Sequence, residues 1–232
     1  MKKSKKSKAI GIISGGLDST IALHKAKNKY HIPYCIFFNY GQKSYKYEKH
    51  ACIKLSRKLK FKLIEIDISF ISDFSKSSLT KQKKAIPRLR KKDLQNKKLL
   101  ISTAHNVMVQ NRNMIFISIA AGIAVELKCN KLITGFNKEE ARAFPDNSKT
   151  FMKSINKTLQ ISLKPYKIKV ISPTINMTKK QMINFAIKNR INLSTIYSCY
   201  TGRKKMCGKC ESCIRLKNAL EGINPKTLGI NL

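Results

Sequence analysis

The stretch Ser14-Gly15-Gly16-Leu17-Asp18-Ser19 decides the fold, because it joins two segments of different hydrophobic periodicity. The apolar run over residues 9–13 predicts a buried strand, and the residues that follow the stretch predict a helix. The two glycines let the backbone approach a ligand closely, and the helix start offers free N–H groups. We therefore expect an anion-binding loop between a strand and a helix. The stretch lacks the lysine of the G-x-x-x-x-G-K-[ST] motif, which excludes the loop that holds a transferable γ-phosphate.

The rest of the chain alternates short apolar runs with longer helical patterns. This alternation predicts an open parallel sheet with helices on both faces, an α/β fold. Strands are expected at residues 9–14, 34–39, 62–68, 131–135 and 168–171, and helices at residues 17–29, 45–59, 113–129, 148–163, 178–189 and 211–221. The helix over 113–129 is apolar on nearly every face, which predicts burial against the sheet. The lysine-dense stretch 81–98 is expected to be a solvated, mobile loop.

The charge of the chain is extreme: 48 Lys and Arg against 12 Asp and Glu give a net charge of +36. Clustered basic residues bind nucleic acid, so a tRNA partner is one interpretation. The other is a genome with AT-rich codons, which enriches Lys, Ile and Asn alike. The lysines are spread over the whole chain, and this favours the second interpretation.

The ends of the chain complete the predicted organisation. Residues 1–8 are read as a basic tail, 9–195 as the main domain and 196–232 as a small C-terminal segment. No apolar run approaches the ~18 residues of a membrane helix, and no small-residue cleavage pattern follows the tail. We therefore expect a cytoplasmic protein that does not associate with a membrane.

The seven cysteines fall into two groups. Cys35, Cys52 and Cys129 stand alone, on a predicted strand and two predicted helices, and are expected to be small buried hydrophobic residues. The other four have the spacing C-x7-C-x2-C-x2-C, which can close a tetrahedron of thiolates; they are Cys199, Cys207, Cys210 and Cys213.

Four candidate roles exist for this cysteine group. Disulfides are disfavoured because nothing indicates an oxidising compartment, and a redox C-x2-C pair does not need four cysteines. An iron–sulfur cluster stays open, since spacing alone does not exclude it. Structural Zn²⁺ is favoured, because four thiolates leave no open position for chemistry on the metal.

The opening stretch has the form SGGxDS and resembles the PP-loop of the ATP pyrophosphatases, which bind the pyrophosphate of ATP and transfer AMP to an oxygen. Further motifs resemble the 7-cyano-7-deazaguanine synthase family of the queuosine pathway in order and spacing. They are Asn39-Tyr40-Gly41-Gln42 with Glu48, Leu79-Thr80, Asn111-Arg112-Asn113, Gly135-Phe136-Asn137, Phe144-Pro145-Asp146, Ile171-Ser172-Pro173, Thr178-Lys179 and Ser198-Cys199-Tyr200. The resemblance runs from about residue 10 to residue 220.

This resemblance implies a Rossmann-like fold of the adenine nucleotide alpha hydrolase type and a ligase that forms carbon–nitrogen bonds. The implied substrates are 7-carboxy-7-deazaguanine, ammonia and ATP, with Mg²⁺ and structural Zn²⁺ as cofactors. The product would be the nitrile, formed through adenylated intermediates and an amide. Relatives of the family suggest a homodimer.

The resemblance also implies site residues. Asp18 is expected to bind Mg²⁺ or to orient the loop, and Arg112 to offset charge on the leaving pyrophosphate. Tyr40, Gln42, Asn137 and Asp146 are expected near the substrate, with Glu139 and Glu140 as other acids for the base. The expected ATP-binding residues are Ile13, Ser14, Gly15, Gly16, Leu17, Asp18, Ser19, Thr20, Ile21, Ala22 and Leu23.

The family usually has a proline where this chain has Gln110, so the turn before Arg112 is expected to be looser.

Three alternative functions remain at this stage. A deazaguanine ligase that stops at the amide is one alternative. A tRNA-modifying PP-loop enzyme, of the lysidine synthase or thiolation type, is the second, and a zinc-dependent RNA-binding module without catalysis is the third.

Overall fold

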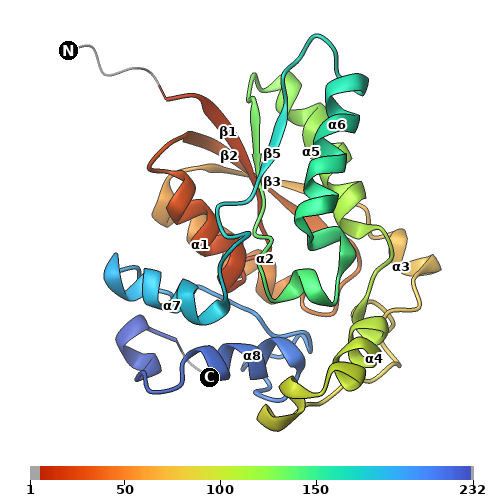
Figure 1. Ribbon diagram of the computed structural model, residues 1–232, viewed down its shortest axis with the longest axis vertical. Helices are drawn as coiled ribbons and strands as arrows, with labels where there is room; N and C mark the ends of the chain where they lie inside the picture. Colours follow the sequence, from red (N-terminus) through yellow and green to blue (C-terminus); the bar gives the residue numbers. More distant parts are fainter. Residues whose placement is uncertain (1–5, 231–232) are drawn as a thin grey trace.

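The computed structural model describes residues 6–230, which form a five-stranded parallel sheet with helices on both faces (Figure 1). The strand order is β3-β2-β1-β4-β5, and every neighbouring pair is parallel. The strands are β1 (Lys8–Ile12), β2 (His31–Asn39), β3 (Lys62–Asp67), β4 (Lys131–Ile133) and β5 (Lys169–Ile171). From β1 the chain first adds β2 and β3 on one side of the sheet and then β4 and β5 on the other side. A crevice is therefore expected at the carboxyl ends of β1 and β4.

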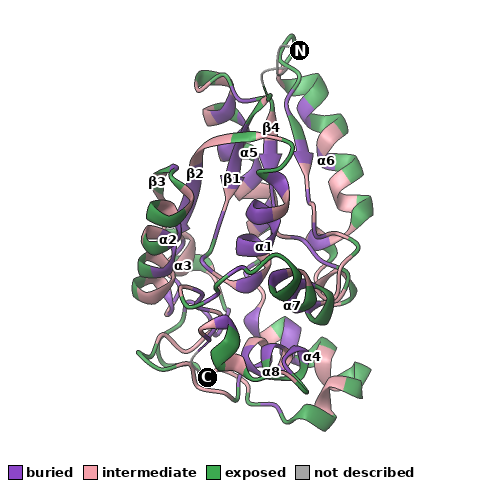
Figure 2. Ribbon diagram, turned by 90° about the vertical axis from the view of Figure 1, so that its left-hand side faces the viewer, coloured by how far each residue is buried: buried purple, intermediate pink, exposed green. Residues whose placement is uncertain are grey.

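Alternation along the strands decides which helices cover which face. Ile10, Phe38 and Leu132 point to one face, where they pack against α5 (Arg112–Glu126) and α6 (Lys149–Ser162). Their neighbours Ala9, Phe37 and Ile133 point to the other face, under α1 (Leu17–Ala26) and α2 (Tyr45–Leu59). This is the period-two pattern of strands that are buried on both faces. Figure 2 shows β1, β4 and the helix faces against them as the buried centre of the molecule, whereas the edge strand β3 has only intermediate and exposed residues.

A third cluster joins the C-terminal segment to the start of the chain. Helices α7 (Lys179–Lys188) and α8 (Glu211–Ala219) pack against each other, and α7 also packs against α1. Leu17 and Ile21 of α1 share this cluster with Met182 and Leu216. The C-terminal segment therefore lies against the helix that begins at the PP-loop.

All five expected strands and six expected helices are present, with ends that differ by a few residues. The helix expected at residues 178–189 begins with a capping box, in which the Thr178 and Gln181 side chains each accept from the other residue's backbone N–H. Two helices were not expected, namely α3 (Ile71–Phe74) and α4 (Lys97–Val107), and neither were the 3-10 turns η1 (Lys91–Gln95), η2 (Glu140–Arg142), η3 (Pro145–Asn147) and η4 (Pro225–Leu228).

One expectation needs correction. Stretch 81–98 is exposed as predicted at most positions, but it is not a free loop. Leu89 is buried, its N–H donates to the Lys209 carbonyl (2.8 Å), and η1 lies within the stretch.

The predicted burial of α5 against the sheet is confirmed, because Ile117, Ala120 and Ala124 pack there. The outer face of the helix, with Ser118 and Gly122, is exposed.

The expected basic tail overlaps the first strand. Residues 1–5 of the expected basic tail and residues 231–232 lie outside the described residues, while Lys8 already belongs to β1. Among residues 6–230, no single helix has the length and apolar character to cross a membrane, whereas α4 and α5 meet those criteria only as a pair bent by 51°. Most of the buried residues of α5 pack against the sheet.

Candidate active site

A cavity opens at the carboxyl ends of β1, β2 and β4, where the strand order predicts a ligand site. The PP-loop forms its floor, and segments from the middle and the end of the chain close it. The polar and aromatic residues of its lining include Ser14, Gly16, Asp18, Ser19, Tyr40, Glu48, Arg112, Phe116, Glu140, Asp146, Tyr197, Ser198 and Tyr200.

The PP-loop is held in a conformation that leaves its donors facing the cavity. Gly15 has φ +72°, and a Cβ there would lie 2.7 Å from the Ala51 Cβ. Gly16 caps α1 without a side-chain hydrogen bond. The Ser14 N–H has only a long contact to the Ser19 hydroxyl (3.4 Å). Free N–H groups at a helix start form a binding site for an anion such as pyrophosphate.

The C-terminal segment supports this loop from behind. The Tyr197 N–H donates to the Gly15 carbonyl (2.9 Å), and the Leu17 N–H contacts the Ser198 hydroxyl (3.4 Å). A Cβ on Gly135, at the end of β4, would lie 2.8 Å from the Ser19 backbone nitrogen. Glycine at position 135 therefore allows β4 to approach α1 closely.

Asp18 belongs to an ion-pair group around Lys179, whose side chain is buried. Its Oδ2 lies 2.5 Å from the Lys179 Nζ, which also lies 3.0 Å from the Glu140 carboxylate. Burial is the main factor that raises the pKa of Asp18 to about 6, and Glu140 and Glu139 add to it, while Lys179 opposes the rise. Attraction to Lys179 outweighs burial at Glu140 and lowers the pKa of that carboxyl. The Asp18 Oδ1 is buried without a hydrogen-bond partner among the described residues, so it is free to accept from a ligand or to bind a metal.

Arg112 stands on the opposite side of the cavity. Its guanidinium donates to the Tyr40 hydroxyl (3.2 Å) and lies over the Tyr40 and Phe116 rings, 5.3 and 5.8 Å from their centroids. Burial raises the pKa of Tyr40 to about 12, against the attraction of Arg112. Tyr40 is thus a neutral hydrogen-bonding group at neutral pH.

Asp146 belongs to η3 and lies against the first turn of α5. Its carboxylate accepts from the Asn113 N–H (3.3 Å), and it lines the cavity as predicted. Asn111 before Arg112 has φ +57°, and the turn is closed by the Arg112 N–H donating to the Val109 carbonyl (3.3 Å). The turn that carries Gln110 in place of proline is therefore hydrogen-bonded.

Two predicted substrate residues lie behind the cavity wall. Gln42 donates to the Phe38 carbonyl and to Glu48, and accepts from the Tyr40 N–H (2.9 Å), so its amide shapes the Tyr40 loop. Asn137 is fully buried, and its side-chain oxygen accepts from the N–H groups of Glu139 and Glu140. Both residues position neighbours that face the site.

The eleven consecutive residues predicted to bind ATP divide in the same way. Ile13, Ser14, Gly16, Asp18 and Ser19 line the cavity. The others face the protein interior: Gly15 against α2, and Leu17, Thr20, Ile21, Ala22 and Leu23 within the packing of α1. A helix exposes to the cavity only its first turn, so the later residues support the site indirectly.

Several site residues were missed as functional by the sequence reasoning. Glu48 is half-buried, its carboxylate accepts from the Ser44 hydroxyl (2.8 Å), and desolvation raises its pKa. Lys179 and Tyr200 were noted only as parts of motifs. The sequence offers one signal for Lys179: it is the first residue of the helix that begins after the Thr178 cap, in the segment that follows β5. Four of the chain's 12 acidic residues line this one cavity, in a protein of charge +36: Asp18, Glu48, Glu140 and Asp146.

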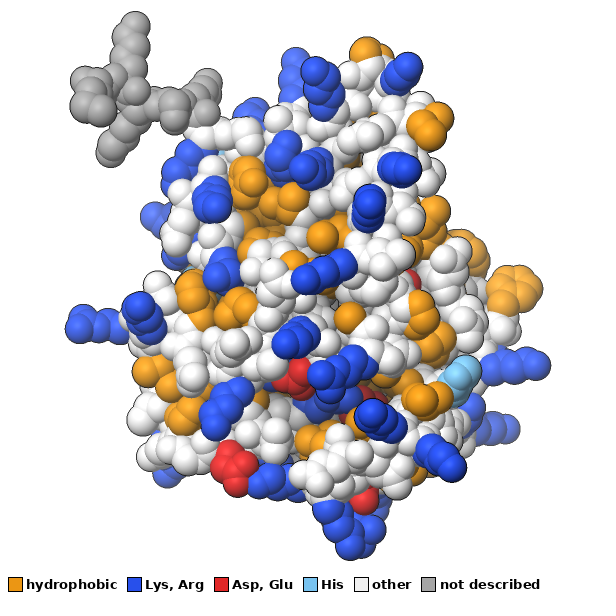
Figure 3. All heavy atoms as spheres, in the orientation of Figure 1, with side chains coloured by type: hydrophobic (Ala, Val, Ile, Leu, Met, Phe, Trp, Pro, Cys, Tyr) orange, Lys and Arg blue, Asp and Glu red, His pale blue; other side chains and the backbone are white. Residues whose placement is uncertain are grey.

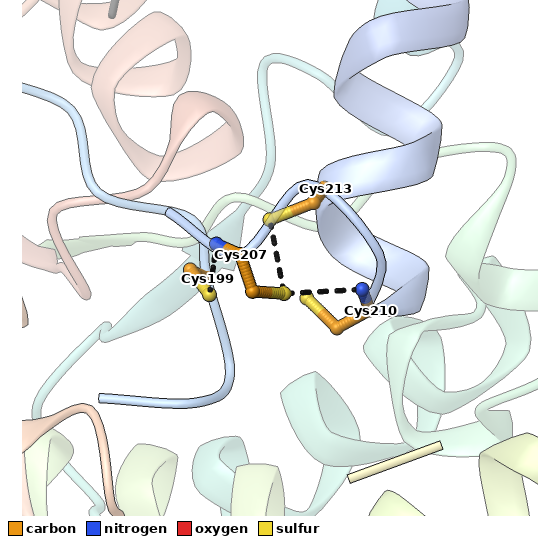
Figure 4. A group of neighbouring side chains, drawn as sticks. All are labelled: Cys199, Cys207, Cys210 and Cys213. Atoms are coloured by element: carbon orange, nitrogen blue, oxygen red, sulfur yellow. Dashed lines mark hydrogen bonds between the residues drawn. The ribbon is translucent and has the colours of Figure 1, made fainter. Parts of the chain in front are cut away.

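The four clustered cysteines form a candidate metal centre beside this cavity (Figure 4). The Sγ atoms of Cys199, Cys207, Cys210 and Cys213 all lie within 4.8 Å of one another. Backbone N–H groups donate to them, including Cys207 to Cys199 (3.2 Å) and Cys210 to Cys207 (3.2 Å). Such donors stabilise thiolates, and sulfur–metal bonds of ~2.3 Å fit a tetrahedron of this size. The residues present therefore fit a four-coordinate metal ion.

The three other cysteines behave as expected. Cys35, Cys52 and Cys129 are buried, and burial raises the pKa of each thiol. A raised pKa removes the reactive thiolate, which disfavours a sulfur-transfer role for Cys35. Cys129 lies after the end of α5, rather than within the helix as predicted.

The surface agrees with the second interpretation of the charge, in which the lysines are spread over the whole chain. Figure 3 shows Lys and Arg side chains scattered over the whole visible face, between apolar and uncharged groups. On this face they do not gather into one continuous patch.

Comparisons with known proteins agree with the family expected from the motifs. A family model described as "Queuosine biosynthesis protein QueC" matches residues 8–224. The chain is 39% identical over 214 residues to a 7-cyano-7-deazaguanine synthase from Methanobrevibacter smithii, covering 92% of this chain and 93% of the relative. It is 42% identical over 221 residues to a 7-cyano-7-deazaguanine synthase from Methanosphaera stadtmanae, covering 94% and 96%.

These matches cover nearly the whole chain and include the PP-loop, the cavity and the cysteine cluster. They confirm the expected family and the expected class of enzyme, a ligase of queuosine biosynthesis. The chain belongs to the QueC family, to which its 7-cyano-7-deazaguanine synthase relatives point as well.

Proposed function

We propose that this chain converts 7-carboxy-7-deazaguanine and ammonia to 7-cyano-7-deazaguanine at the expense of ATP, through two adenylations in one cavity. The observation that carries the proposal is the PP-loop at the cavity floor, with its free N–H groups beside the ion pair of Asp18 with the buried Lys179. Family membership supplies the substrate class.

The chemistry requires two rounds at the same carbon. The substrate carboxylate attacks the α-phosphorus of ATP, pyrophosphate leaves, and a mixed anhydride forms. Ammonia then adds to the carbonyl carbon, and AMP leaves to give the amide. In the second round the amide oxygen takes AMP from a second ATP, and loss of AMP and a proton forms the C≡N bond. Both adenylates are hydrolysed by water, so the cavity must exclude it.

The residues that line the cavity suit this reaction. The N–H groups of Gly16, Asp18 and Ser19 bind the pyrophosphate in this proposal. Arg112 faces the reacting groups with a fixed positive charge that offsets charge as it develops. Burial beside Tyr40, Phe116 and Phe144 provides an apolar wall for a planar base. Asp146 is the proposed acceptor for the N–H edge of the base.

Two metal ions are part of the proposal. Asp18, with its unpartnered Oδ1, would hold Mg²⁺, whose chemistry is to neutralise phosphate charge. The four cysteines would hold Zn²⁺ in a closed site, where the ion contributes to folding. An iron–sulfur cluster on the same thiolates is the alternative, and metal analysis with an absorption spectrum separates the two.

We also propose a homodimer in the cytoplasm. The dimer is supported by half-buried apolar side chains on α5, including Ile115, Ile119 and Ile123, and light scattering coupled to gel filtration tests it. The cytoplasm is supported by the free thiols, which a reducing compartment preserves.

The deciding experiment is AMP release coupled to mass spectrometry of the product. The purified chain with ATP, Mg²⁺, ammonium and 7-carboxy-7-deazaguanine should release two AMP per nitrile formed. One AMP per amide would establish the amide-forming alternative. AMP release that depends on tRNA and ignores the deazaguanine would refute the proposal in favour of tRNA modification.

A further inference from the structure

A second ion pair lies directly beside the cysteine cluster. Arg215 stands on α8, two residues after Cys213, and its guanidinium binds the Glu211 carboxylate at 2.8 and 2.9 Å. The Arg215 side chain is only 11% exposed and the Glu211 side chain 5%. A buried arginine is orientated strictly by its partners, because its planar guanidinium has donors in fixed directions.

Arg215 also reaches across to the turn that precedes η2. Its Nη1 lies 3.4 Å from Glu139 Oε2. The other oxygen of the same carboxylate accepts from the backbone N–H of Lys179 at 2.6 Å. Glu139 therefore joins the cysteine segment to the first turn of α7 with one carboxylate.

Lys179 completes the connection to the PP-loop. Its backbone is held by Glu139, and its side chain, 4% exposed, extends to Asp18 and Glu140. A buried ammonium that lost these partners would carry a large desolvation cost, so the position of Lys179 is fixed by its carboxylates.

We propose that Arg215, Glu139 and Lys179 are positioning residues through which the cysteine segment sets the geometry of Asp18 in the PP-loop. The inference rests on the proposed function, since Asp18 matters only if the PP-loop binds ATP. It assigns the metal-bound segment a role beyond holding the chain end in place. Four of the 12 acidic residues and two basic residues belong to this chain of contacts, and all six side chains are at most 27% exposed.

The test uses two variants that remove either end of the Arg215–Glu139 contact. Arg215→Met removes the guanidinium and leaves the Glu139 carboxylate held by the Lys179 N–H. Glu139→Gln keeps the length of the side chain and an oxygen that can accept from the Lys179 N–H, but it removes the charge that attracts Arg215.

Both variants break the Arg215–Glu139 contact, so both should lower kcat for AMP formation by about 10-fold while KM for ATP changes far less. Arg215→Lys should recover part of the loss. Lys91→Met is the matched control, because it removes an ion pair to Glu221 that also contacts the C-terminal segment but is exposed (61% for both side chains). This control should match the wild type.

Two readouts make the outcome decisive. Metal content and thermal denaturation should stay near wild type in Glu139→Gln, which does not alter the cysteine segment. Crystal structures of the two variants should show the Lys179 ammonium displaced from Asp18. An unchanged kcat in Glu139→Gln, or an Asp18–Lys179 pair that stays in place in Arg215→Met, would overturn the inference. A wild-type chain without deazaguanine-dependent AMP release would refute the proposed function, and the crystal structures would still test the coupling.

Discussion

Substitution of Gly15 by alanine should distort the PP-loop with a cost that can be worked out from the structure. Gly15 has φ +72°, in the left-handed region, and a Cβ there would lie 2.7 Å from the Ala51 Cβ and 2.9 Å from the Glu48 carbonyl oxygen. The left-handed backbone costs an alanine about 1–2 kcal/mol. Overpacking against α2 adds about 1–3 kcal/mol. The free energy of unfolding should therefore fall by roughly 2–5 kcal/mol.

The assay is urea denaturation followed by circular dichroism, together with AMP formation. Because the loop can relieve the contact only by moving away from α2, AMP formation should fall by about 10²-fold, the cost of a displacement near 1 Å. Gly122→Ala is the matched control: it lies in α5, and nothing lies within 4 Å of its Cβ position. That variant should be more stable by about 0.5–1 kcal/mol, because alanine favours the helix.

A second variant separates the two terms for Gly15. In Gly15→Ala with Ala51→Gly, the closest contact is absent and the φ strain remains, so part of the stability should return. If the urea midpoint of unfolding is the same in Gly15→Ala as in the wild type, the loop does not depend on this glycine and the prediction is wrong.

Three further predictions concern the metal centre and Asp18. Cys207→Ala should lose the metal and melt at a lower temperature, because a closed metal site contributes folding energy, whereas Cys35→Ala should keep the metal; native melting with full metal content in Cys207→Ala would contradict this. Asp18→Ala should keep its fold and form no AMP. Its stability at neutral pH should change little, since a raised pKa means that the folded state disfavours ionised Asp18. In the free wild-type enzyme, kcat/KM should fall below pH about 6 as Asp18 gains a proton. This decrease should persist when the ionic strength is held constant across the pH series.

Most of the fold could be predicted from the sequence because its signals are local. The apolar run before Ser14, the glycines and the capping box at Thr178 each act within a few residues. Helix α4 was missed because its lysine-rich start resembles a loop, and the contact between Leu89 and Lys209 that anchors the stretch joins residues far apart in the chain.

The site shows the same division. The positions of Asp18, Arg112 and the four cysteines follow from motifs. The sequence could not predict that Gln42 and Asn137 would turn from the cavity to brace the Tyr40 and Glu139 loops. It also could not pair Lys179 with Asp18, since burial of a lysine depends on carboxylates supplied by other elements.

The contacts between Tyr197 or Ser198 and the PP-loop bear on how the protein is made. The Leu17–Ser198 contact spans 181 residues, so the first loop to be synthesised receives its support almost last. At ~5–20 residues per second, the ribosome takes on the order of 10–40 s to produce that stretch. An incomplete chain therefore carries an ATP loop without its brace, and the site matures only after the cysteines have emerged. Synthesis itself thus delays ATP turnover until the metal centre can form.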